Sequence, residues 1–159
     1  MKHVFKKTLL TILAVLTVLT LAFSLVACGG TDDGSGIITV VVESAPYGSE
    51  SIETKSYEVD LDNVTGEGLI GVFEHLRDAE GLEFVMDGTM VSRIGNLEND
   101  YTNGVYIYLY TSVAADQDVS SYATTKEYNG MTLVSSGVGL SDMSAPDGAV
   151  IYVGTIFYG

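Results

Sequence analysis

The sequence is short of cysteine, histidine and positive charge, and each shortage excludes a class of protein. Its 159 residues include one cysteine, so no internal disulfide can form and the core alone must hold the fold. Two histidines and one cysteine cannot supply the ligands of a tetrahedral zinc site. Lys and Arg number 7 against 21 Asp and Glu, for a net charge of −14. So acidic a protein repels phosphate backbones, and we expect no nucleic acid partner.

The sequence also lacks the short motifs of the commoner hydrolases. It contains no Gly-x-Ser-x-Gly elbow, no Ser-x-x-Lys pair and no His-Glu-x-x-His helix. The one histidine after the N-terminal segment is His75, which we expect to lie exposed and alone on the outer side of a helix. A general base would need partners there. We therefore predict that the protein is not an enzyme.

Two acidic clusters could bind a hard cation through loop oxygens. They are Asp60-Leu61-Asp62-Asn63 and Asp116-Gln117-Asp118. Neither has the spacing of a calcium loop, with its central glycine and terminal glutamate. Solvated turn or cap residues explain them better, so we predict no metal site.

A long uncharged run occurs near the N-terminus, at residues 8–27. It follows Lys2, Lys6 and Lys7 and ends in Leu25-Val26-Ala27-Cys28. A basic start, an apolar middle and a small residue before the end are typical of a signal peptide. The last four residues resemble the lipobox of bacterial lipoproteins, which implies that Cys28 carries lipid and becomes the mature N-terminus. A retained transmembrane helix is the alternative, since twenty uncharged residues suffice to span a bilayer.

Three regions follow from this interpretation. Residues 1–27 are the signal peptide, residues 28–36 are the lipidated cysteine with a flexible Gly/Asp/Ser tether, and residues 37–159 are one folded domain. The first region holds three of the seven basic residues and no acidic one, so the mature chain has a net charge of −17. We expect a monomer, anchored by lipid to the extracytoplasmic face of the cell membrane.

The folded region begins with two predicted strands and a helix. Residues 37–42 are β-branched and apolar on both faces, as in an interior strand, whereas residues 52–61 alternate as in a half-buried hairpin strand. Helical spacing of apolar side chains follows, with N-cap candidates at residues 62–65 and Gly81 placed to end the helix. The apolar residues of this helix are Leu69, Val72, Phe73 and Leu76.

The remainder is predicted to be mostly strands. Residues 82–86 and 90–94 flank the hairpin turn Asp87-Gly88, and a polar turn occupies residues 95–100. Residues 105–113 form a long central strand; shorter strands are expected at residues 122–128 and 131–134, a loop at 135–146, and a last strand at 149–158. This order predicts an α+β fold: a β-grasp-like mixed sheet with one helix packed on a face, preceded by the N-terminal signal helix and tether.

Several short motifs in this region resemble one family. They are Leu69-Ile70-Gly71-Val72-Phe73-Glu74-His75-Leu76, the hairpin at residues 85–90, Ile94-Gly95-Asn96-Leu97, Glu127-Tyr128-Asn129-Gly130-Met131 and Asp147-Gly148-Ala149-Val150-Ile151-Tyr152. They are similar to segments of the transcobalamin-like C-terminal domain, a β-grasp-like module found in bacterial surface lipoproteins. The family often has a tryptophan before the Asn-Gly turn and an aspartate at the position of Ala149; this chain has neither. The resemblance implies the fold, and it implies cobalamin as a conceivable ligand.

Tyrosines are the most suggestive side chains. Tyr106, Tyr108 and Tyr110 share one face of a predicted strand, and Tyr122, Tyr128, Tyr152 and Tyr158 come from segments that could pair near it. A rigid apolar ring with a polar tip suits small planar ligands, sugars and protein partners. The candidate binding residues are Tyr106, Tyr108, Tyr110, Tyr128, Asn129 and Tyr152. Alternatively, the tyrosines form a second core face under the loop at residues 135–146.

Two functions remain open at this point. The first is a non-catalytic binding module that captures a small ligand, such as a cobalamin-like compound, or a surface partner, with no resident cofactor. The second is a structural or adhesive module of the cell envelope that mediates contacts between proteins.

Overall fold

The computed structural model describes residues 35–159. The predicted signal peptide, Cys28 and most of the tether lie outside this range. Among the described residues, no helix has the length and hydropathy needed to cross a bilayer.

Residues 35–159 form one α-helix and nine strands in two sheets, which confirms the α+β class. Three short 3₁₀ turns occur at Leu61–Asn63, Ala114–Asp116 and Leu140–Asp142. In chain order the helix and strands are β1 (Ile37–Glu43), β2 (Thr54–Asp60), α2 (Gly68–Glu80), β3 (Phe84–Asp87), β4 (Met90–Ile94), β5 (Leu97–Glu98), β6 (Val105–Thr111), β7 (Thr125–Tyr128), β8 (Met131–Ser135) and β9 (Val150–Phe157).

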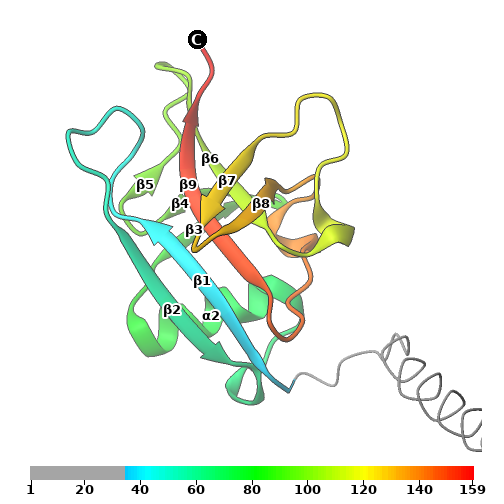
Figure 1. The fold of residues 1–159 in the computed structure, drawn as a ribbon. Helices are drawn as coiled ribbons and strands as arrows, with labels where there is room; N and C mark the ends of the chain where they lie inside the picture. The colour runs from blue at the N-terminus through cyan, green and yellow to red at the C-terminus, as the bar shows by residue number, and fades with distance from the viewer. Residues whose placement is uncertain (1–34) are drawn as a thin grey trace, which may run out of the picture. The chain divides into compact units, whose positions relative to one another are not determined.

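The larger sheet has six strands in the order β2-β1-β9-β6-β8-β7 (Figure 1). β1 pairs with β2 as an antiparallel hairpin and with β9 in parallel, and the other pairs are antiparallel. The smaller sheet has the order β3-β4-β5. β6 lies inside the larger sheet, as predicted for the long strand at residues 105–113.

The main core lies between one face of the larger sheet and α2. Val72 and Phe73 of α2 are fully buried there, together with Val40 of β1 and Ile151 of β9. Leu140 and Met143, which follow β8, also belong to this core, and the Leu69 N–H donates to the Met143 carbonyl. The segment at residues 135–146 is therefore anchored on the helix side of the sheet.

The opposite face of the sheet carries a second core under the β7–β8 hairpin. Val41, Tyr110, Leu133 and Tyr152 are buried there. β7 and β2 are the two edges in the strand order, yet the Tyr128 hydroxyl of β7 donates to Ser56 of β2 at 3.3 Å. The larger sheet is therefore so strongly curved that the β7–β8 hairpin lies over the face of the sheet to which it belongs (Figure 1).

Three local predictions are wrong. The helix begins after Glu67 without a side-chain cap, because the chain first makes the 3₁₀ turn at Leu61–Asn63, which Asp60 caps. Leu97 is fully buried and pairs in β5, whereas residues 95–100 were expected to be a polar turn. His75 is half-buried beside the apolar stripe of α2 and not exposed. The predicted helix end is confirmed, since Gly81 adopts the left-handed conformation, φ 70°, which costs glycine little.

Candidate functional site

Seven of the ten tyrosines form one continuous array over the sheet face opposite α2. Neighbouring ring centroids lie 5.8 to 6.3 Å apart, within the range in which aromatic rings attract one another. The order along the array is Tyr101, Tyr106, Tyr158, Tyr108, Tyr110, Tyr152 and Tyr128.

Tyr110, Tyr152 and Tyr128 form the inner end of the array, which lies beside a buried carboxylate. Glu43, 4% exposed, accepts the Lys126 ammonium at 2.7 Å and the Tyr152 hydroxyl at 2.8 Å on one oxygen. Its other oxygen accepts the Thr155 N–H at 3.2 Å. Lys126 also lies 4.7 Å from the centroid of the Tyr152 ring. This satisfied network ties β7 to β1 and β9, so the inner tyrosines serve the fold.

Glycine at position 154 makes room for this carboxylate. A Cβ placed there would lie 2.7 Å from the Glu43 carboxyl carbon, closer than real side chains approach. Burial would lower the pKa of Lys126, but the hydrogen bond to Glu43 and its charge raise that pKa overall. Burial and the nearby Glu43 raise the pKa of Tyr152 to about 12, so its hydroxyl remains a donor at neutral pH.

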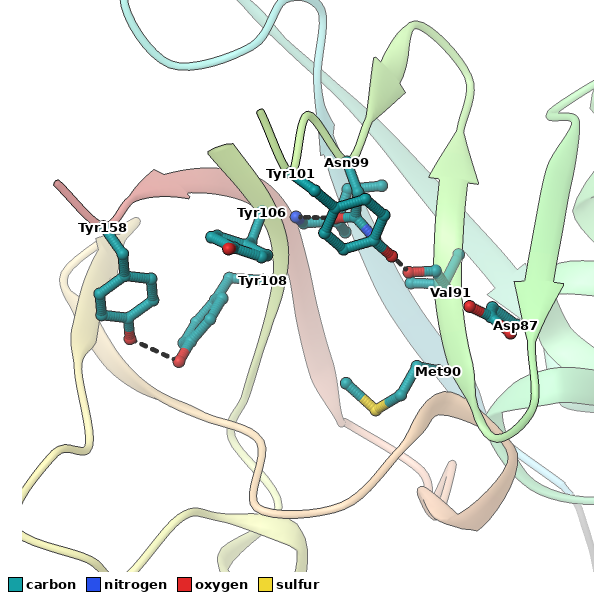
Figure 2. A pocket seen from close by; sticks show the side chains of 9 residues that line it. Asp87, Met90, Val91, Asn99, Tyr101, Tyr106, Tyr108 and Tyr158 are labelled. Atoms are coloured by element: carbon teal, nitrogen blue, oxygen red, sulfur yellow. Dashed lines mark hydrogen bonds between the residues drawn. The ribbon is translucent and has the colours of Figure 1, made fainter. Parts of the chain in front are cut away.

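The outer end of the array lines an open pocket of about 430 Å³ (Figure 2). That volume falls in the range of small-molecule sites, roughly 300–1,000 Å³. A smaller hollow of about 110 Å³ adjoins it and shares four lining residues. The larger pocket is lined by Asp87, Met90, Val91, Asn99, Tyr101, Tyr106, Ile107, Tyr108 and Tyr158.

The pocket exists because β6 has an incompletely paired edge. On one side β6 pairs with β9 along its whole length, but on the other β8 reaches only Tyr110 and Thr111. The β3–β4 hairpin stands beside the rest of that edge and supplies Asp87, Met90 and Val91. Since the pocket lies at an edge, Ile107 from the main core and the tyrosines from the opposite face both line it.

Asn99 holds the two sides of the pocket together. Its side-chain oxygen accepts the Ile107 N–H of β6 at 2.6 Å, and its side-chain nitrogen donates to the Val91 carbonyl of β4 at 3.3 Å. The same nitrogen lies 3.3 Å from the Tyr101 hydroxyl. One amide therefore fixes the spacing between β4 and β6 and places Tyr101 at the rim (Figure 2).

The loop that carries Tyr101 is ordered by Asp100. Its carboxylate accepts the Thr102 and Asn103 N–H groups at 3.1 Å and the Asn103 amide at 2.6 Å. These hydrogen bonds, that of the Asn103 side chain first, lower the pKa of Asp100. An ionised Asp100 thus holds the loop in shape at neutral pH.

A hydroxyl pair closes the far wall of the pocket. The Tyr108 and Tyr158 hydroxyl oxygens lie 2.6 Å apart, joining β6 to the segment after β9 (Figure 2). Burial, followed by the hydrogen bond to Tyr158, raises the pKa of Tyr108 to about 12. The Tyr108 phenol is therefore neutral under physiological conditions.

The structure separates the predicted site residues into two groups. Tyr106 and Tyr108 line the pocket, whereas Tyr110 and Tyr152 are buried in the second core and Tyr128 packs against it. Asn129 adopts φ 49° in the β7–β8 turn. Tyr122, 84% exposed, lies outside the array. Tyr110 and Tyr152 are covered by the β7–β8 hairpin. The loop at residues 135–146, which was the expected cover, packs on the other side of the sheet.

Sequence reasoning did not single out Asp87, Met90, Asn99 and Tyr101 as site residues. Asp87 was interpreted as a turn residue, and Asn99 as part of a polar turn. A usable signal was present: a tyrosine and several amide or acidic side chains cluster just before the tyrosine-rich strand. What was missing was the knowledge that the β3–β4 hairpin stands against the edge of β6.

The two acidic clusters have structural roles. Asp60 caps the 3₁₀ turn at Leu61–Asn63. Asp116 was expected to be solvated, but it is only 7% exposed. One of its carboxylate oxygens accepts both the N–H and the hydroxyl of Ser144, at 2.8 and 2.7 Å. Within residues 35–159 no three His, Cys, Asp or Glu side chains gather as they would around a metal ion.

Comparisons with known proteins add little to this description. No family model matches the chain, and no curated protein matches it. Among solved structures it is similar to a crystal structure from Ruminococcus gnavus, a protein described provisionally as metal binding. The two share 9% identity with a TM-score of 0.46, over 79% of this chain and 100% of that one. A likeness of this size bears neither on the ligand nor on the activity of this chain.

Proposed function

We propose that this protein is a non-catalytic binding module, anchored by lipid on Cys28 to the extracytoplasmic face of the cell membrane, which captures a small ligand. The observation that carries the proposal is the pocket at the edge of β6. Its size suits a small molecule, its walls are mostly apolar, and a few polar groups converge on it.

The strand order supports the finer description of the fold as β-grasp-like. A first hairpin, a helix over one face, and a last strand inserted in parallel beside β1 are the features expected of that fold. This agreement favours the transcobalamin-like domain as the family. A complete cobalamin molecule is larger than the pocket of about 430 Å³, so it would contact the pocket with only part of its surface.

Replacing Cys28 with serine tests the anchor. A hydroxyl cannot take the place of the lipidated thiol, so Cys28→Ser is expected to abolish incorporation of a palmitate analogue and to release the protein from the membrane fraction. Metabolic labelling and fractionation of producing cells measure both. Cys28 is the one cysteine of the chain, so continued labelling of the variant would contradict lipidation at this position.

Amide NMR titrations test the pocket. Cyanocobalamin, glucose, phenol and choline serve as probes, and at least one is expected to shift the amides of Asn99, Tyr101 and Ile107. Tyr101→Ala should weaken that binding about fivefold, which corresponds to ~1 kcal/mol for a lost aromatic contact. Tyr122→Ala is the matched control, since both tyrosines are exposed but only Tyr101 lines the pocket.

The alternative function, an envelope module that mediates contacts between proteins, is favoured by one observation. Val119 and Tyr122, 97% and 84% exposed, stand on the loop between the 3₁₀ turn at Ala114–Asp116 and β7. Exposed apolar side chains of this kind are frequent at protein contacts. Under this alternative none of the four probes shifts the amides of the pocket, and that result would overturn small-ligand capture there.

A further inference from the structure

Four aromatic rings and one carboxylate define the chemistry of the pocket. The rings are those of Tyr101, Tyr106, Tyr108 and Tyr158, and the carboxylate is that of Asp87. No lysine, arginine or histidine is among the residues that line it in the described part of the chain. Aromatic faces carry negative potential, so both kinds of group favour positive charge.

The rings are inclined to one another instead of stacked. Tyr106 meets Tyr101 at 69° and Tyr158 at 63°, and Tyr108 meets Tyr158 at 56°. In such edge-to-face pairs the edge of one ring meets the face of its neighbour, so the four rings present walls of several orientations around the pocket that they line. Hydrogen bonds of Asn99 and of the Tyr108–Tyr158 pair hold these walls in place before any ligand arrives.

From this arrangement we infer that the ligand is a small organic cation, a compound with a quaternary or tertiary ammonium group that occupies the space between the four tyrosine rings and Asp87. The inference rests on the proposed function and specifies its ligand class. A cation within about 6 Å of a ring centroid gains attraction from that ring. Asp87, which lines the same pocket, adds a negative charge to it.

The charges of the whole chain agree with this assignment. Three of the four basic residues after residue 27 already have a carboxylate partner: Lys55 with Glu80, Arg77 with Asp78, and Lys126 with Glu43. The chain after residue 27 has a net charge of −17, which draws cations towards the surface and repels anions. A sugar or a neutral ring would fill the same volume without using either the carboxylate or the net charge.

Choline and 3,3-dimethylbutan-1-ol provide a matched pair of probes. They have the same shape and hydroxyl group, but carbon replaces the charged nitrogen in the second. Amide NMR titration of the protein is expected to show choline binding at least about tenfold more tightly, with shifts around Tyr101 and Ile107. Raising the salt to about 1 M, where the Debye length is ~3 Å, should weaken choline and leave the alcohol unchanged.

Two variants locate the cation. Tyr101→Leu removes an exposed ring, and Asp87→Asn removes the charge while replacing the Asp-Gly turn by Asn-Gly, which is equally suited to a hairpin. Each is expected to reduce choline affinity several-fold and to spare the alcohol. Tyr122→Leu and Asp62→Asn make the same changes outside the pocket and should leave choline binding intact.

The possible outcomes separate the inference from the function on which it rests. Equal affinities for choline and the alcohol would overturn the cation and leave small-ligand capture standing. If choline shifts no amide of the pocket but glucose, phenol or cyanocobalamin does, the cation inference is overturned and small-ligand capture still stands. If no probe shifts those amides, both the inference and the proposed capture fail.

Discussion

Lys126→Met is expected to lower the free energy of unfolding by about 3 kcal/mol, because it leaves the buried carboxylate of Glu43 without its cation. The Tyr152 hydroxyl and the Thr155 N–H would remain as donors, which places the loss at the lower end of values for a broken buried ion pair. Urea unfolding of the variant measures it. The whole stability of a domain is only about 5–15 kcal/mol, so the effect is large.

Lys55→Met is the matched control. Lys55 pairs with Glu80 at 3.8 Å, but both side chains are more than half exposed, so the same substitution should cost at most about 1 kcal/mol. Adding Glu43→Gln to Lys126→Met should recover part of the loss, because a neutral amide oxygen can still accept from Tyr152 without carrying charge. If Lys126→Met is no more destabilised than Lys55→Met, the pair has no special role in the fold.

Alkaline pH is the condition under which the domain is expected to lose most stability. The pKa of Tyr108 and of Tyr152 is raised from 10.0 to about 12 in the folded chain. Below pH 10 these phenols are neutral whether the chain is folded or not, so they cost nothing. Between pH 10 and 12 the unfolded chain releases their protons and the folded chain does not, which favours unfolding. Lys126, whose pKa is also raised, acts in the same direction.

Ultraviolet titration of tyrosinate measures this directly. Two tyrosines, Tyr108 and Tyr152, should ionise near pH 12 or together with unfolding. Tyr108→Phe should remove one of these two late transitions, whereas Tyr122→Phe, at an exposed position outside the array, should leave both in place. Unfolding midpoints that do not change between pH 10 and 12 would contradict the assignment.

Much of the fold was accessible from local patterns. Apolar residues on both faces of β1 and β6 predicted interior strands, helical spacing predicted α2, and Asp87-Gly88 and Asn129-Gly130 predicted hairpin turns. The strands and the helix can be recognised locally, because burying one face makes apolar residues recur every 2 residues in a strand and every 3.6 in a helix. The start of α2 was missed because two of the candidate caps, Asp62 and Asn63, lie within the 3₁₀ turn that precedes it.

The candidate site, like the fold, was predictable in part from local patterns and in part not. Sequence by itself determined that tyrosines gather on one face of a central strand and that the chain after residue 27 is strongly acidic. Only the tertiary structure decided which tyrosines are buried around Glu43 and which line a pocket, because the division depends on where β8 stops pairing with β6 and on the β3–β4 hairpin beside that edge. Asp87, Asn99 and Tyr158 line this one pocket although Tyr158 is far from the other two along the chain, and no pattern along the sequence records a contact between a hairpin and the edge of a strand in another sheet.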